Sequence, residues 1–204
     1  MKKLALSFLL LMMALGVNAE LPEGLQVVSL RMGDVTTLGP YTRVAAPVSL
    51  AYEYLFLTDA FDVPSLCLGV GAVLGHAAVS TTTTTTYNET GKTDTRTTTN
   101  RWFFGGVKGY VHYNVLSLFG VDAPQVDTYA SLTLGSRIKK WSWKGENASS
   151  TPSEVSSESS TTTRSPMAGL QVGARYYFTP NIGVSLEAGY DGMSIVDFGI
   201  VACF

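Results

Sequence analysis

Seven charged or titratable residues are the first candidates for chemistry, because each lies in a segment where apolar and polar residues alternate: Arg31, Glu53, Lys108, His112, Arg175, Glu187 and Asp197. If the chain reverses between them, Glu187 and Asp197 face each other, and two like charges in that arrangement are destabilising. A cation is therefore expected beside them, with Arg31 as the first candidate and Lys108 or Arg175 as alternatives. The set predicts a structural ion-pair network that fills a narrow channel. The competing interpretation is a proton-sharing carboxylate pair that serves conduction or catalysis.

Other residues with reactive side chains form no recognisable site. His76 and His112 invite comparison with membrane-embedded acyl hydrolases, but no serine lies at a fixed spacing from either, so neither catalytic residues nor enzyme activity are expected. Cys67 and Cys203 are too few for a disulfide framework, and no Cys/His cluster indicates a metal. We expect two buried thiols, no metal and no cofactor. A net charge of −2 argues against a nucleic-acid partner.

The segments that carry these residues are predicted to be β-strands. Residues 181–190 place apolar side chains at every second position, and residues 168–178 repeat the pattern. Residues 179–181 have the composition of a tight turn, so these two strands are expected to be antiparallel neighbours. The same alternation predicts eight strands, over residues 27–33, 48–54, 66–75, 102–113, 128–138, 168–178, 181–190 and 196–204.

The composition favours a barrel in a membrane. Hydrophobic residues make up 46% of the chain and charged residues 15%, yet after residue 19 no apolar run approaches the roughly 20 residues of a spanning helix. In hydrocarbon every backbone polar group must be paired within the protein, which leaves a closed barrel. We therefore predict an all-β fold, an eight-stranded antiparallel up-and-down transmembrane β-barrel with the charged set in its lumen. A soluble secreted β-sandwich is the more distant alternative.

Both ends of the sequence carry features of exported proteins. Lys2 and Lys3 precede a short apolar run that ends in small residues, which predicts a signal peptide over residues 1–19, cleaved after Ala19, and a barrel over residues 20–204. The sequence ends on Phe204, which closes an alternating strand and is similar to the signature that bacterial barrel-assembly machinery reads. The expected location is the outer membrane of a Gram-negative bacterium, in contact with its lipid.

Two long connections are expected outside the cell, a Thr-rich one at 80–100 and a Ser-rich one at 144–165. Because Thr favours strands, the first is expected to extend its hairpin and to offer an edge to which a partner chain can add a strand. Residues 147–163 are expected to be disordered. The simpler interpretation is that both connections are solvated loops around the barrel mouth.

Several strands resemble a known family. Residues 173–184 and 186–190 look like the penultimate hairpin of the small outer-membrane β-barrel domain family common in Bacteroidota, and residues 47–54 and 106–113 are similar to its earlier strands. The resemblance implies the eight-stranded barrel of the OmpA/OmpX/opacity-protein kind, whose members mostly have no assigned activity. It does not cover the long connections, and a fold of this kind does not specify a function.

Together these observations predict an outer-membrane barrel with a structural or surface-interaction role, in envelope integrity, adhesion or the binding of an extracellular or host partner. The first alternative is a narrow porin or conduit for small solutes. The second is a lipid-modifying outer-membrane enzyme.

Overall fold

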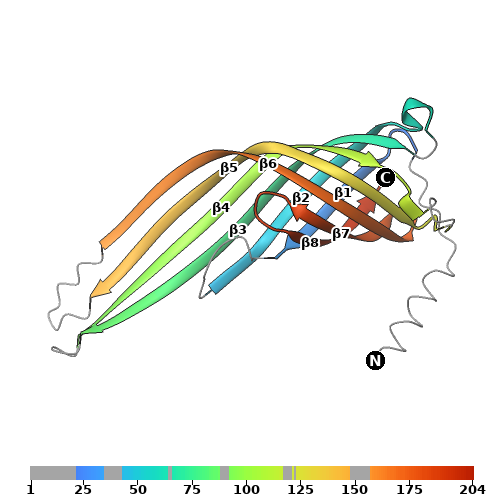
Figure 1. Ribbon diagram of the computed structural model, residues 1–204. Coiled ribbons are helices and arrows are strands. Elements are labelled where there is room, and N and C mark those ends of the chain that lie inside the picture. Colours follow the sequence, from blue (N-terminus) through green and yellow to red (C-terminus); the bar gives the residue numbers. More distant parts are fainter. Residues whose placement is uncertain are drawn as a thin grey trace, which may run out of the picture.

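Eight antiparallel strands close into one barrel in chain order, with the last strand paired back to the first (Figure 1). The computed structural model describes residues 22–34, 43–63, 66–87, 92–116, 121, 123–147 and 157–204. The strands are β1 (Gln26–Gly33), β2 (Arg43–Leu57), β3 (Cys67–Tyr87), β4 (Lys92–His112), β5 (Val126–Asn147), β6 (Ser157–Thr179), β7 (Ile182–Tyr190) and β8 (Val196–Cys203). Among these residues, no helix is long and apolar enough to cross a bilayer.

Alternation along each strand divides the side chains between the inside and the outside of the barrel. In β8, Asp197, Val201 and Cys203 are buried inside, whereas Phe198 and Ile200 are exposed. The other strands follow the same rule. The predicted fold class, strand count and inward-facing positions are therefore confirmed, because a period of two leaves each strand only two ways to face. The predicted signal peptide, residues 1–19, lies outside the described residues.

Two short turns join the last three strands, and backbone hydrogen bonds join the last strand to the first. Between β6 and β7, the Thr179 hydroxyl accepts a hydrogen bond from the backbone N–H of Ile182 at 3.0 Å. Between β7 and β8, Asp191 Oδ1 accepts bonds from the N–H groups of Met193 and Ser194, both at 2.7 Å. At the opposite end of β8, Phe204 exchanges two 3.0 Å backbone bonds with Gln26, which closes the barrel onto β1.

Four strands continue well past the barrel and form a sheet, called here the projecting sheet, that comprises residues 76–87, 92–103, 138–147 and 157–164. Figure 1 shows this sheet running away from the end of the molecule where the C-terminus lies. Cross-strand hydroxyl pairs support it, including Ser80 with Thr99 at 3.0 Å and Thr82 with Thr97 at 3.3 Å. Threonine fits a pleated surface, so its repetition extends the ladder.

The projecting sheet confirms the expectation that the Thr-rich connection extends its hairpin and corrects the expectation for the Ser-rich connection. The Thr-rich hairpin does extend as a strand pair, so residues 80–87 and 92–100 are not a loop. In the Ser-rich segment, residues 144–147 and 157–165 are also strand, and the expectation of disorder is wrong over 157–163. Pairing with β5 orders these serines, because the partner strand supplies hydrogen bonds to their backbone N–H and C=O groups. The composition of the segment does not reveal this partner. Residues 148–156 lie outside the described part.

The barrel interior is layered along its axis. One apolar cluster, at the end nearer the C-terminus, contains Val27, Leu55, Cys67, Tyr177, Val201 and Cys203. A second, toward the projecting sheet, contains Ala51, Val73, Ala77, Val79, Trp102, Phe104, Met167 and Met193. Both cysteines are buried free thiols, as expected. The seven charged residues singled out above lie between these two clusters.

Candidate functional site

A first group of charges, called here the Glu187 cluster, is centred on the carboxylate of Glu187 in β7. Arg31 Nη1 donates to Glu187 Oε2, and Lys108 Nζ donates to the same oxygen at 2.9 Å. The Tyr129 hydroxyl donates to Glu187 Oε1 at 2.6 Å. These donors come from β1, β4 and β5, so the cluster joins β7 to strands that are not its neighbours in the sheet.

Asp197 lies directly opposite Glu187 in the register of β7 and β8 but has different partners. Gln171 Nε2 donates to Asp197 Oδ2 at 2.8 Å, and the Ser194 hydroxyl donates to Asp197 Oδ1 at 2.6 Å. The Gln171 carbonyl oxygen in turn accepts a 2.9 Å bond from Lys108. The two facing carboxylates are therefore linked through the Gln171 amide and Lys108 in series, and both cations contact Glu187.

A second group, the Glu53 cluster, lies nearer the C-terminal end of the barrel. His112 places Nε2 2.6 Å from Glu53 Oε1 and Nδ1 2.9 Å from Asp127 Oδ1. Arg175 donates to Glu53 Oε2 and, at 3.3 Å, to Asp127 Oδ2. Both ring nitrogens of His112 face carboxylates, an arrangement that suits the imidazolium form because it donates from both.

Aromatic rings connect the two clusters. The Arg175 guanidinium lies 4.4 Å from the centre of the Tyr129 ring, whose hydroxyl belongs to the Glu187 cluster. Tyr110 stacks on His112 with ring centres 6.0 Å apart. The Tyr110 ring also contacts Lys108 of the Glu187 cluster, whose Nζ lies 5.3 Å from the ring centre. Cation–aromatic contacts of this kind favour the charged form of Arg and Lys where water is excluded.

The structure places all seven predicted residues inside the barrel, each at most 4% exposed. Glu187 is bound by Arg31, the first candidate, and also by Lys108, an alternative. Arg175, the other alternative, belongs to the Glu53 cluster. His76 lies apart from this site, on the outer surface against Phe103, with ring centres 4.6 Å apart.

Four further members of the site were not singled out from the sequence: Asp127, Tyr129, Gln171 and Ser194. Asp127 has the same parity as Tyr129 in β5, and it was missed because the predicted strand began at residue 128, whereas β5 begins at Val126. Tyr129 and Gln171 were placed inside by parity, but their sequence carries no signal of a specific partner. Ser194 lies in the turn between β7 and β8, where alternation gives no information.

The arrangement balances charge. Arg31 and Lys108 balance Glu187 and the facing Asp197, and Arg175 with the imidazolium of His112 balances Glu53 and Asp127 in the Glu53 cluster. Buried charges of this kind are stable only when paired and hydrogen-bonded, as these are. Among the described side chains, no group of three or more His, Cys, Asp or Glu residues is placed to hold a metal ion.

These features define an eight-stranded β-barrel with an ion-paired interior and an apolar outer surface. No protein-family model matches the chain, and no curated protein matches it. Among solved structures, Ail, the attachment invasion locus protein of Yersinia pestis, matches with a TM-score of 0.44 and 13% identity, covering 89% of this chain and 97% of that one. Another structure of Ail, in complex with the heparin analogue sucrose octasulfate, has a TM-score of 0.43 and 15% identity over 89% and 97% of the two chains.

The N-terminal β-barrel domain of Pseudomonas aeruginosa OprF is similar at a TM-score of 0.42 and 16% identity, over 89% of this chain and 98% of that one. With identities this low, the likenesses concern the fold and not the activity.

Proposed function

We propose that this chain is an outer-membrane barrel with a filled lumen, which holds the projecting sheet at the cell surface for interaction with a partner. The layered interior carries the proposal: two balanced ion clusters lie between two apolar clusters, so the barrel acts as a support and not as a channel. Export through a signal peptide cleaved after Ala19, and assembly that reads Phe204, belong to the same proposal.

The outer surface supports a membrane location. Apolar side chains that face outward are exposed on every strand of the barrel, among them Leu30, Leu50, Val70, Leu74, Val107, Leu132, Leu134, Leu170, Val172, Leu186, Phe198 and Ile200. Soluble monomers rarely expose so continuous an apolar surface, because its contact with water is unfavourable. The surrounding lipid is then the first partner of the barrel.

The outer edge of β6 supports a surface-interaction role. Over residues 157–169, β6 pairs only with β5 among the described strands, since its pairing with β7 begins at Leu170. Pro166 lies on this stretch, and proline within a sheet is confined to edges and bulges. An open edge of this length suits an extended peptide segment of a partner protein, which adds as a further strand.

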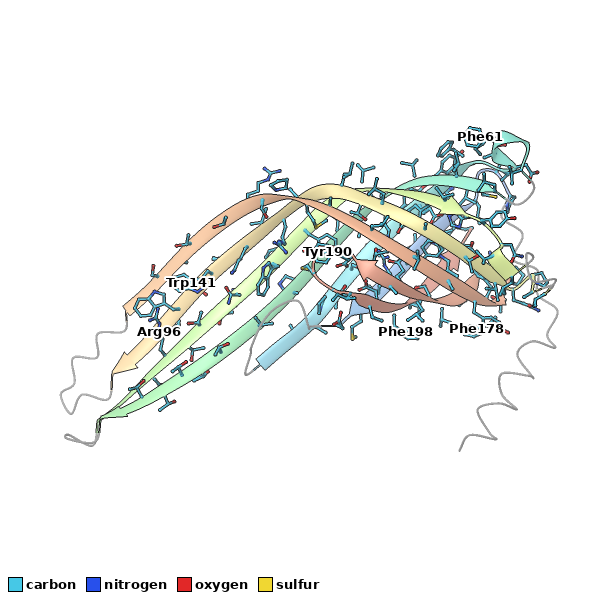
Figure 2. The ribbon with its side chains drawn as sticks, viewed as in Figure 1. Phe61, Arg96, Trp141, Phe178, Tyr190 and Phe198 are labelled. Carbon is cyan, nitrogen blue, oxygen red and sulfur yellow. The ribbon has the colours of Figure 1, made fainter. Side chains whose placement is uncertain are left out.

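Tryptophan side chains add apolar contact area beside this edge. Trp141 and Trp143 of β5 lie on the sheet face that continues the barrel interior, and both are half-buried. Arg96 of β4 lies 4.7 Å from the Trp143 ring centre. Figure 2 labels Trp141 and Arg96 on the projecting sheet, away from the barrel. Aromatic and arginine side chains are enriched where proteins bind partners.

The test is to shorten the projecting sheet without disturbing the barrel. Residues 81–98 and 143–159 are each replaced by Asn-Gly, which joins strands at the paired positions Ser80–Thr99 and Ser142–Ser160. Cells that display the full chain or the shortened chain are compared for adhesion to immobilised extracellular-matrix proteins, glycosaminoglycans and epithelial monolayers. Equal surface amounts and heat-modifiable gel migration of both chains are the controls for folding and insertion.

Loss of adhesion in the shortened chain is the expected result. Equal adhesion of both chains would contradict the surface-interaction role, and extraction of the full chain without detergent would contradict the membrane location.

A further inference from the structure

Three cations gather on the outward face of the projecting sheet, where the apolar surface of the barrel ends. Arg101 of β4 lies directly opposite Lys140 of β5. Arg164 of β6 lies opposite Ile138, one step closer to the barrel on the same face and diagonal to Lys140. Side chains opposite each other across strands are about 5 Å apart, and diagonal ones about 7–8 Å.

Nothing in the described part of the protein neutralises this cluster. None of its ion pairs includes Arg101, Lys140 or Arg164, and the paired rows of the projecting sheet that hold these three residues contain no Asp or Glu. The nearest acidic position along this face, Glu158, is two outward-facing positions beyond Thr162, the residue opposite Lys140. Like charges directly opposite each other destabilise a sheet unless an anion lies between them.

The rows around the cluster follow a chemical order along the strands. Closest to the barrel, Leu74 is exposed on the outer surface, followed by a row in which Arg164 lies beside Ile138 and Phe103. The next paired row holds Arg101 and Lys140. The row after it holds Ser80, Thr99, Ser142 and Ser160, all hydroxyl side chains at paired positions. With distance from the barrel, the exposed apolar side chains thus end in a row that already includes Arg164, and the Arg101–Lys140 row and then the hydroxyl row follow.

We propose that Arg101, Lys140 and Arg164 bind the phosphate groups of a phosphorylated glycolipid in the outer leaflet. The acyl chains of that molecule pack on the apolar row, its phosphates sit among the three cations, and its sugar hydroxyls face the hydroxyl row. This inference rests on the proposed outer-membrane location. Arginine binds phosphate through two parallel N–H bonds, which makes such a site stronger than a lysine patch alone.

A lipid fits these observations better than a free anion. The cations adjoin an exposed apolar surface, so an amphiphile gains from both, whereas a soluble phosphate gains only the electrostatic part. Removing one phosphate contact of this kind costs roughly a tenfold loss of affinity or more, as charge-assisted bonds do.

The experiment compares two variants that each remove one arginine and one lysine charge from the same sheet. The test variant is Arg101→Gln with Lys140→Gln. The control variant is Arg96→Gln with Lys139→Gln, whose residues lie on the opposite face, near the Trp143 and Trp102 rings. Each full-length mature chain, folded in neutral detergent, is titrated with bisphosphorylated lipid A, and bound lipid is counted by native mass spectrometry.

Wild type and the control variant are expected to bind lipid A at least about tenfold more tightly than the test variant. Dephosphorylated lipid A is expected to lose the same advantage. In neutral detergent without lipid A, the test variant should be at least as heat-resistant as wild type, because a like-charge contact is gone. A purely structural role for the two cations would instead make it less heat-resistant.

Three results would overturn the inference: equal lipid A affinity of the test and control variants, equal affinity for phosphorylated and dephosphorylated lipid A, or full displacement of lipid A by millimolar inorganic phosphate. The last result would identify a free-anion site. If wild type inserts into bilayers yet shows any of these, the inference fails while the proposed membrane location stands. A failure of wild type to insert would overturn both.

Discussion

Glu187 lies directly opposite Asp197 across β7 and β8, and both carboxylates are buried. Two cations contact Glu187, while Asp197 is held by the amide of Gln171 and the hydroxyl of Ser194. The pair is therefore asymmetric, although its positions in the sheet are equivalent. Substitutions that remove one charge at a time should have unequal effects.

Glu187→Gln is expected to destabilise the barrel by about 3–5 kcal/mol, because it leaves Arg31 and Lys108 buried without their counter-ion. Asp197→Asn is expected to change stability by less than about 1 kcal/mol, since it removes one of two facing like charges and an amide still bonds to neighbours. Urea unfolding in lipid vesicles measures both. Equal losses for the two variants would show that the asymmetry has no energetic consequence.

Arg31→Met tests the cation side of the same cluster. Glu187 keeps Lys108 and the Tyr129 hydroxyl, so the expected loss is about 3 kcal/mol, at the lower end for a broken buried pair. Arg31→Lys is the matched control and should lose less, because it keeps the charge. Barrel stability unchanged in Arg31→Met would count against an ion network that supports the fold.

In the Glu53 cluster, His112→Phe is expected to cost about 3 kcal/mol, because Arg175 is then left to neutralise both Glu53 and Asp127. The ring itself is preserved for stacking on Tyr110. Adding Asp127→Asn restores the balance of charge and should recover most of the loss, so the two substitutions are coupled. Additive losses in this double-mutant cycle would mean that charge balance does not govern the cluster.

The inward-facing members of these clusters could be predicted because alternation decides which face a residue takes, as it did for Arg31, Glu53 and Asp197. Their partners could not. Arg31, Lys108 and Glu187 come from β1, β4 and β7, which meet only across the lumen, and the stagger that brings them together is a property of the closed barrel.

Strand length was the other feature that the sequence did not determine. Thr81 to Thr86 and the serines near residue 160 lack alternation between apolar and polar side chains, so no pattern marked where a strand ends. In the structure the ladder continues as long as the neighbouring strand does, through the Ser142–Ser160 and Trp143–Ser159 pairs.

A filled lumen predicts that the wild-type barrel in planar bilayers shows no stable unitary current. Trp102→Ala with Met193→Ala opens the apolar cluster near the projecting sheet, yet it should also show none, because the two ion clusters still occupy the interior. Channel recordings at fixed salt measure both. A stable current in the wild type would favour the narrow-porin alternative over the surface-interaction role.

Phe204 combines two contributions that separate variants can distinguish. Its backbone exchanges two 3.0 Å hydrogen bonds with Gln26, and the residue is 63% exposed on the outside. Deleting Phe204 removes these two bonds and should lower the stability of the barrel refolded in detergent. Phe204→Ala keeps the backbone bonds, so its free energy of unfolding should lie within about 1 kcal/mol of the wild-type value. In cells, in contrast to refolding in detergent, the ring is expected to matter more than the backbone bonds. If the assembly machinery reads the ring, Phe204→Ala lowers the amount of folded barrel in the outer membrane. Phe204→Tyr keeps an aromatic ring and should restore that amount. Normal assembly of Phe204→Ala would leave the residue with only its backbone role.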